Sequence, residues 1–76
     1  MNCVENIRKW LKGWGKDFYA RLSKDGKTYG VWYWDNRKGW TLVTLVDRNT
    51  FRHNAVEAKK QIQPHLTLFV LFERSS

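Results

Sequence analysis

The chain has 76 residues, of which 14 are Lys or Arg and 7 are Asp or Glu, so its net charge is +7. This length predicts a single small domain over residues 1–76 and excludes a multidomain enzyme. A hydrophobic content of 42% is too high for a disordered tail, so we expect a buried core. The single cysteine, Cys3, excludes an internal disulfide and a multi-cysteine zinc site.

The sequence shows no membrane-directing feature. No apolar run reaches the ~18 residues of a transmembrane helix, and the first residues lack the basic and apolar regions of a signal peptide. We therefore expect a cytoplasmic protein without a membrane partner.

An amphipathic pattern opens the chain. Apolar residues recur there at helical spacing: Val4, Ile7, Leu11 and Trp14. With charged residues between them, they predict a helix over residues 3–12 that ends near Gly13.

Two segments, in which the residues of the two strand faces alternate, then flank Asp25-Gly26. Asp-Gly is the favoured pair for a two-residue type I′ turn, so the pattern predicts an antiparallel hairpin. The expected pairs are Leu22 with Tyr29, Ala20 with Val31, and Phe18 with Tyr33. These six share one face. The other face would carry Tyr19, Arg21, Trp32 and Trp34.

Residues 40–46 are rich in β-branched side chains and follow a turn cluster, so they predict a third antiparallel strand. Its register stays open, because a three-residue and a four-residue loop both end acceptably at Gly39. A slip of one residue exchanges the faces of Leu42 and Val43.

The C-terminal third predicts a short helix and a final strand. Asn54 and Glu57 have capping spacing, and Pro64 is expected to stop the helix at Gln63. We expect this helix to pack on the sheet through Ala55, Ala58 and Ile62, with Phe51 one turn earlier. Residues 66–73 would be apolar on both strand faces, as in a strand covered on both sides.

The expected fold is therefore one α+β domain with the order α-β-β-β-α-β. Its first three strands form an antiparallel meander. A right-handed crossover through the second helix would place the last strand beside the first, in sheet order 3-2-1-4, with the helices packed on the sheet.

Three strands followed by a helix are similar in element order to DNA-binding domains of the AP2 and integrase-arm types. Double-stranded-RNA-binding domains share the order α-β-β-β-α, but the sequence lacks their lysine cluster at the helix start, and those domains have no counterpart for the fourth strand expected here. Element order does not assign a site.

Catalytic motifs are missing from the sequence. His53 and His65 have no cysteine or carboxylate at ligand spacing, so we expect surface histidines and no metal site. Cofactor, phosphate-loop and hydrolase motifs do not occur, so we expect no cofactor and no enzymatic activity. His53 with Arg48 and Arg52 is the one grouping to test for nuclease chemistry.

The basic residues indicate a binding role. In a meander, the first loop and the end of the third strand lie at one end of the sheet, which brings together Lys24, Lys27, Arg48 and Arg52. Arg37 and Lys38 would lie at the opposite end. Such charges suit contacts with phosphates, although a solvated surface has the same composition.

The face with Tyr19, Arg21, Trp32 and Trp34 suits the stacking of bases. The first helix also needs a partner for its apolar stripe, and we expect it to cover this face rather than leave a binding platform. A domain of this size still leaves part of its aromatic surface uncovered, which usually marks an interface.

We therefore predict a small non-enzymatic protein that binds nucleic acid. The candidate contact residues are Arg21, Lys24, Lys27, Trp32, Trp34, Arg37, Lys38, Arg48 and Arg52. The alternative is a protein-interaction or inhibitory accessory module, of a mobile-element or phage type, that acts through an apolar sheet surface. The doubly apolar last strand predicts a homodimer or a larger protein partner over Phe69 and Leu71.

Overall fold

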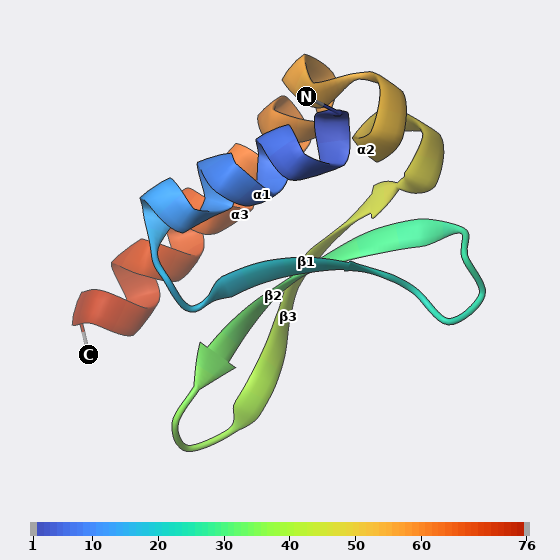
Figure 1. Ribbon diagram of the computed structural model, residues 1–76. Coiled ribbons are helices and arrows are strands. Elements are labelled where there is room, and N and C mark those ends of the chain that lie inside the picture. The colour runs from blue at the N-terminus through green and yellow to red at the C-terminus, as the bar shows by residue number, and fades with distance from the viewer. Residues whose placement is uncertain (1, 76) are drawn as a thin grey trace.

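The computed structural model describes residues 2–75, with side chains described for residues 2–71. The elements in chain order are α1 (Cys3–Trp14), β1 (Phe18–Leu22), β2 (Thr28–Asp35), β3 (Gly39–Asp47), α2 (Arg48–His53) and α3 (Ala55–Ser75). The three strands form one antiparallel sheet in the order β1-β2-β3. The long helices α1 and α3 lie together on one face of this sheet, and the opposite face has no helix over it (Figure 1).

Helix α1 forms where the apolar periodicity predicts it. Asn2 caps it, because its side-chain oxygen accepts a hydrogen bond of 2.8 Å from the backbone N–H of Glu5. The helix continues two residues past the expected end, through Gly13 to Trp14. Ile7 and Leu11 are fully buried, so the predicted apolar stripe is the buried face.

The hairpin register is confirmed. Phe18 pairs with Tyr33, Ala20 with Val31, and Leu22 with Tyr29. The predicted turn type is wrong. A type I′ turn needs positive φ at both central residues, whereas only Gly26 has it, at φ 72°. The connection is wider, since the backbone N–H of Ser23 donates to the carbonyl of Thr28.

Strand β3 resolves the open register. Asp35 pairs with Gly39, so the loop has three residues, and Leu42 lies opposite Trp32 on the uncovered face. A β-bulge between the pairs of Val31 and Trp32 then adds one residue to β3. Val43 accordingly packs toward the core, and Val46 further along is buried there as well.

The C-terminal strand and the sheet order 3-2-1-4 are wrong. Residues 66–73 belong to helix α3, and within residues 2–75 no strand follows β3. The observed order is α-β-β-β-α-α. The short helix α2 was also missed, although its Phe51 is fully buried and stacks on Tyr29 at 4.2 Å between ring centroids.

Helix α3 begins as predicted but does not stop at Pro64. Asn54 caps it by accepting from the backbone N–H of Glu57 at 3.1 Å. Pro64 removes the donor that would bond to the carbonyl of Lys60. Because Lys60 and Pro64 are both exposed, water can satisfy that carbonyl and the helix continues.

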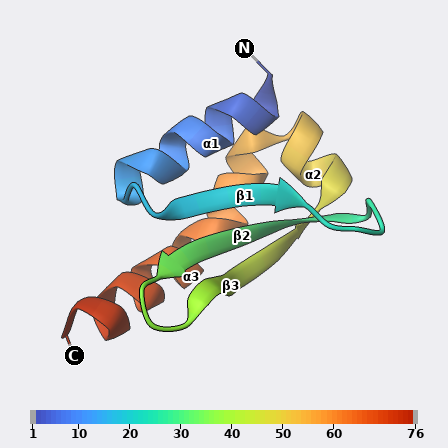
Figure 2. The same cartoon turned by 60° about the horizontal axis from the view of Figure 1, so that its bottom comes forward.

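The core lies between the two long helices and one face of the sheet. Its fully buried members include Ile7 and Leu11 of α1, Ala20 and Val31 of the sheet, and Ala58, Ile62 and Leu66 of α3. In Figure 2, α1 runs alongside β1 and α3 passes behind the strands. The expectation that α1 covers the face of Trp32 and Trp34 is therefore wrong, because α1 packs on the face of Phe18 and Ala20.

Candidate nucleic-acid interface

We call the uncovered side of the sheet the open face. Cross-strand pairs define it, because paired residues share a face: Tyr19 with Trp32, Arg21 with Gly30, Trp34 with Trp40, Trp32 with Leu42, and Gly30 with Leu45. Several of its large side chains are strongly exposed. Tyr19 is 45% exposed, Trp40 is 53% exposed and Leu45 is 54% exposed. This is a contiguous apolar surface of a kind that usually marks a binding site.

The aromatic side chains of the open face contact one another across the strands. Trp34 and Trp40 meet edge to face with ring centroids 5.3 Å apart. Tyr19 and Trp40 lie 6.4 Å apart at a tilt of 51°. Trp40 thus connects rings from β1 and β2, and the contacts hold the exposed rings in place without a helix above them.

Gly30 and Trp32 are two residues apart on β2 and therefore lie on the same face of the sheet. A Cβ atom at Gly30 would sit 2.6 Å from the indole nitrogen of Trp32. The indole therefore lies close over the backbone of Gly30, a position that only glycine permits without a shift. The missing side chain lets Trp32 extend along the sheet surface.

Two hollows lie on the open face on either side of Trp32. The first has a volume of about 200 Å³ and is lined by Tyr19, Arg21, Trp32 and Trp40. The second has a volume of about 330 Å³ and is lined by Arg21, Leu22, Ser23, Lys24, Gly30, Trp32 and Leu45. Arg21 and Trp32 line both hollows, so the two hollows are adjacent and share these two residues.

Basic groups surround the aromatic surface. The guanidinium of Arg8 donates to the carbonyl of Ala20 at 3.1 and 3.2 Å and lies 5.2 Å from the ring centroid of Tyr19. It therefore occupies a carbonyl of the outer strand β1 and supports Tyr19 by a cation–π contact. Arg21 is exposed on the face itself.

Two acidic residues, Asp25 and Asp35, are engaged in the turns at the two ends of the sheet. The hydroxyl of Ser23 and the backbone N–H of Lys27 donate to Asp25 and hold the pKa of its carboxyl below the usual value. The backbone N–H groups of Arg37 and Lys38 do the same for the pKa of Asp35.

Asp47 is the one acid among the described strand residues that pair on the open face, opposite Thr28. Its carboxylate accepts from the backbone N–H groups of Asn49 and Thr50 and so caps α2. None of these carboxylates lines the two hollows. Arg21 is consequently the charged group of the first hollow, and an anion there meets no carboxylate from its lining.

The structure brings part of the predicted site together. Arg21, Lys24 and Trp32 line the second hollow, and Trp34 lies beside Trp40. Lys27 and Arg48 lie together at the hairpin end, as predicted, where the N–H of Arg48 donates to the carbonyl of Lys27 at 3.1 Å. That region also contains Asp25 and Asp47, so its charge is mixed.

Other predicted residues lie elsewhere. Arg37 and Lys38 are exposed in the turn between β2 and β3, at the far end of the open face from the hairpin. Arg52 is exposed on α2, one helical turn after Arg48 and outside the two hollows, and α2 packs against α1, α3 and the sheet. The sequence interpretation left out Trp40, Leu42 and Leu45, which only the three-residue loop and the bulge place on this face.

The residues expected at an oligomer interface lie on α3. Phe69 packs within the chain, 4.7 Å from the ring centroid of Tyr33 and 6.0 Å from that of Phe18. Leu71 is 61% exposed. The strand on which the interface prediction depended does not exist, so Phe69 contributes to the core edge instead.

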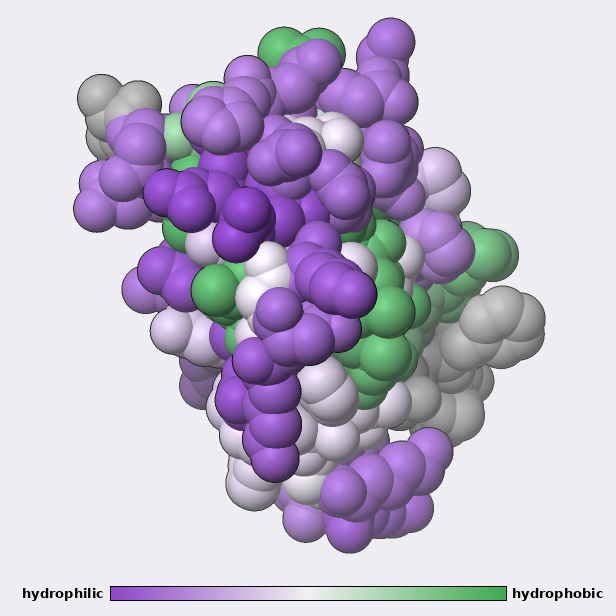
Figure 3. Space-filling view, turned by 90° about the vertical axis from the view of Figure 1, so that its right-hand side faces the viewer, coloured by the Kyte–Doolittle hydropathy of each residue, from purple (hydrophilic) through white to green (hydrophobic). Residues whose placement is uncertain are grey.

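The space-filling view shows how hydrophilic and hydrophobic side chains are distributed on one side of the molecule. Seen from the hairpin side, hydrophilic surface covers the upper part of the molecule, continues down its middle and recurs at the lower edge, and a hydrophobic patch lies at mid-height on the right (Figure 3). Tryptophan and tyrosine have intermediate hydropathy, so an aromatic face is not strongly coloured on this scale.

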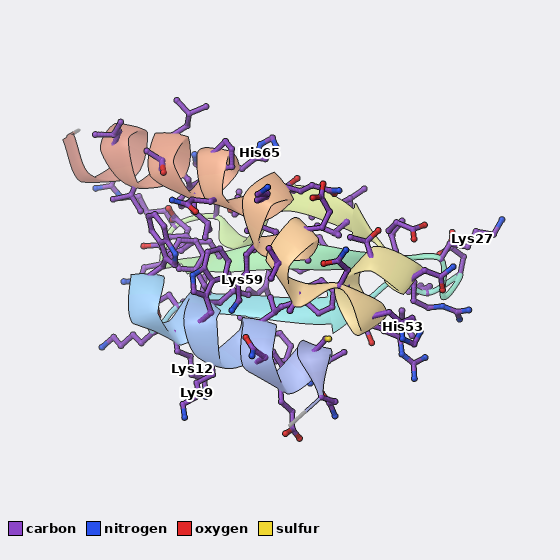
Figure 4. The ribbon with its side chains drawn as sticks, turned by 90° about the horizontal axis from the view of Figure 1, so that it is seen from above. Lys9, Lys12, Lys27, His53, Lys59 and His65 are labelled. Carbon is purple, nitrogen blue, oxygen red and sulfur yellow. The ribbon has the colours of Figure 1, made fainter. Side chains whose placement is uncertain are left out.

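The histidines form no joint site. His53 lies on α2 and His65 on α3, at separate places on the molecule (Figure 4). Among the residues that the structure describes, no group of three or more His, Cys, Asp or Glu could hold a metal ion. Within the same residues, no helix has the length and apolar character that crossing a membrane requires.

No protein-family model matches the sequence, and no significant match was found among curated proteins or solved structures. The functional argument therefore depends on the geometry of the open face.

Proposed function

We propose that the protein binds nucleic acid through the open face of its sheet. The observation that carries the proposal is the first hollow, which Arg21 lines together with the aromatic residues Tyr19, Trp32 and Trp40. Aromatic rings stack on bases, and an arginine beside them can stack as well or bind a phosphate. This chemistry fits a polyanion that also carries planar rings.

The charge of the chain supports the same partner. A net charge of +7 attracts a polyanion at long range, while Asp25 and Asp35 are engaged in turns and Asp47 caps α2. Lys24 lies at the hairpin end of the open face and Arg37 and Lys38 at the other. A strand of nucleic acid laid along the face would meet basic side chains at both ends.

The hollows also fit ring systems better than a large cofactor. Small-molecule sites commonly enclose roughly 300–1,000 Å³. The first hollow is below this range and the second is near its lower limit, at about 200 and 330 Å³. Trp32 lines both, so each is suited to a base lying against its indole.

A protein partner is the second candidate, and the exposed leucines favour it. Leu42 and Leu45 add aliphatic surface that base stacking does not require. Aromatic residues and arginine are also enriched in protein interfaces. The two candidates separate by salt dependence, because phosphate binding weakens steeply with salt whereas apolar contacts change little.

The test uses the intrinsic fluorescence of the five tryptophans. We expect quenching when a pool of random oligonucleotides is added at low salt, and a steep loss of affinity as salt increases. Arg21→Ala should weaken binding about tenfold. Lys60→Ala removes one positive charge from α3, in the helix layer on the other side of the sheet, and should change the affinity by less than about twofold. Equal effects of the two substitutions, or no binding by the parent at low salt, would refute the proposal.

A further inference from the structure

We infer that the open face takes single-stranded DNA, with two consecutive unpaired bases in the two adjacent hollows and Arg21 between them. The inference rests on the proposed function and names its substrate. It follows from the kind of contact that the face offers, from the arrangement of the hollows and from the distribution of charge.

The face offers rings and few hydrogen-bonding groups. The first hollow contains three aromatic side chains, and its polar groups are the hydroxyl of Tyr19, the guanidinium of Arg21 and the indole N–H groups. A duplex presents base edges and phosphates in its grooves, and these are read by hydrogen bonds. The faces of bases become available only in an unpaired strand, where aromatic side chains stack on them.

The arrangement of the hollows gives the number of bases. Both hollows share the indole of Trp32, which lies over Gly30 and forms the boundary between them. A ring in the first hollow contacts Trp32 and the neighbouring aromatic side chains. A ring in the second contacts Trp32 and the aliphatic surface of Leu45. Two neighbouring bases of one strand can therefore bind on opposite sides of Trp32.

The basic side chains on the open face indicate where the phosphates of the strand would lie. Arg21 lines both hollows, so its guanidinium can reach the phosphate that connects the two bases. Lys24 lines the second hollow and is exposed, which places an ammonium group where the strand leaves the aromatic surface. Arg37 and Lys38 are available where it leaves at the other end.

The low polarity of the face selects DNA over RNA. A ribose 2′-hydroxyl buried against Trp32, Leu42 or Leu45 would lose its hydrogen bonds to water, and these side chains offer no acceptor in return. Deoxyribose carries no such group and loses nothing there. We therefore expect the affinity for a DNA strand to exceed that for an RNA strand of the same sequence.

The same charges argue against a second copy of the chain as the occupant. Two open faces stacked on one another would bring together two proteins of charge +7. They would also enclose two Arg21 guanidiniums, while no carboxylate lines either hollow to pair with them. A polyanion removes both penalties.

The first experiment compares four labelled ligands by fluorescence anisotropy at one salt concentration: a 12-residue oligo(dT) strand, the same strand annealed to its complement, the matching oligo(U) strand, and a strand whose nucleotides are abasic. We expect the oligo(dT) strand to bind most tightly. The abasic strand keeps the charge but has nothing to stack, so its affinity should fall at least tenfold.

The second experiment moves the shared indole. Gly30→Ala would place a Cβ 2.6 Å from the indole nitrogen of Trp32, so the ring must leave its position. We expect a loss of affinity for oligo(dT) of about 5- to 150-fold, the equivalent of one stacked base. Gly13→Ala is the matched control, because nothing lies within 4 Å of a Cβ there. Trp32→Ala is the second variant, and thermal melting confirms that each protein is folded.

The outcomes separate the inference from the proposed function. If duplex, oligo(U) or the abasic strand binds as tightly as oligo(dT), or if Gly30→Ala and Trp32→Ala both leave the affinity unchanged, the inference is wrong while nucleic-acid binding stands. If no nucleic acid binds, and the protein instead dimerises through Trp40 and Leu45, both proposals are overturned.

Discussion

Both faces of the sheet carry apolar side chains, but helices cover only one of them. The covered face presents small or branched side chains at its centre, such as Ala20 and Val31, and both are fully buried under the helices. The open face presents Trp32, Trp34 and Trp40, which would hold a helix away from the strands. The covered face also carries the rings of Phe18, Tyr29 and Tyr33, but these flank Ala20 and Val31, so the small residues at the centre let the helices approach closely enough to pack.

The largest expected effect comes from truncating the same side chain on each side of the sheet. Leu11→Ala removes a fully buried leucine from between the helix and the strands and should lower the free energy of unfolding by about 2–5 kcal/mol. Leu45→Ala removes an exposed leucine from the open face and should cost less than about 1 kcal/mol. Urea unfolding measures both. Similar losses would mean that the open face is part of the core.

A smaller change in the free energy of unfolding, of opposite sign, is expected from replacing Pro64 in α3, the helix on the covered face. Proline inside a helix costs up to about 3 kcal/mol relative to alanine. Because Pro64 is exposed, Pro64→Ala should restore the missing bond without creating a cavity and should raise the free energy of unfolding by about 1–3 kcal/mol. Chemical denaturation tests this. A loss of stability would show that α3 depends on its proline, and the affinity for oligonucleotides should stay at the parent value.

The same helix shows why part of the fold could not be predicted. Residues 66–72 are apolar at six of seven positions, so periodicities of two and of 3.6 fit them equally well. Ile62, Leu66 and Phe69 lie at helical spacing, but Pro64 interrupts the stripe and favoured a stop. Whether the helix stops or continues at Pro64 depends on whether water can reach the carbonyl of Lys60. That depends on the exposure of Lys60 in the folded protein, which the local sequence does not give.

The hairpin was predictable because its alternation is regular and Asp25-Gly26 lies at its centre, which set every pair of β1 and β2. The candidate site was only half predictable. Arg21, Trp32 and Trp34 follow from that alternation. Trp40, Leu42 and Leu45 depend on a loop length and a bulge that local patterns leave open, and the choice of face by α1 depends on packing across the whole sheet.

The cap of α3 gives an effect of intermediate size. Asn54 accepts from the backbone N–H of Glu57, and its loss leaves that donor to water. Asn54→Ala should lower the free energy of unfolding by about 1 kcal/mol, and Asn54→Ser should recover most of it. Thermal melting distinguishes them. If the alanine variant is as stable as the parent, the covered face is stabilised by packing alone. Binding at the open face should be the same in all three proteins.

The smallest effect is expected from acid, at the two turns that border the open face. Hydrogen bonds hold the pKa values of Asp25 and Asp35 below their ordinary value of 3.8. A depressed folded pKa stabilises the fold fully above the unfolded value, and this contribution is lost as the pH falls through the folded pKa. Stability should therefore be flat with respect to these two groups above about pH 5 and fall in stronger acid.

The double variant Asp25→Asn with Asp35→Asn should show a shallower fall in urea titrations between pH 5 and 2. Identical slopes would mean that the turns are not stabilised by their ionised carboxylates. At neutral pH the same variant removes two negative charges from the ends of the open face, so it should also bind oligo(dT) slightly more tightly than the parent.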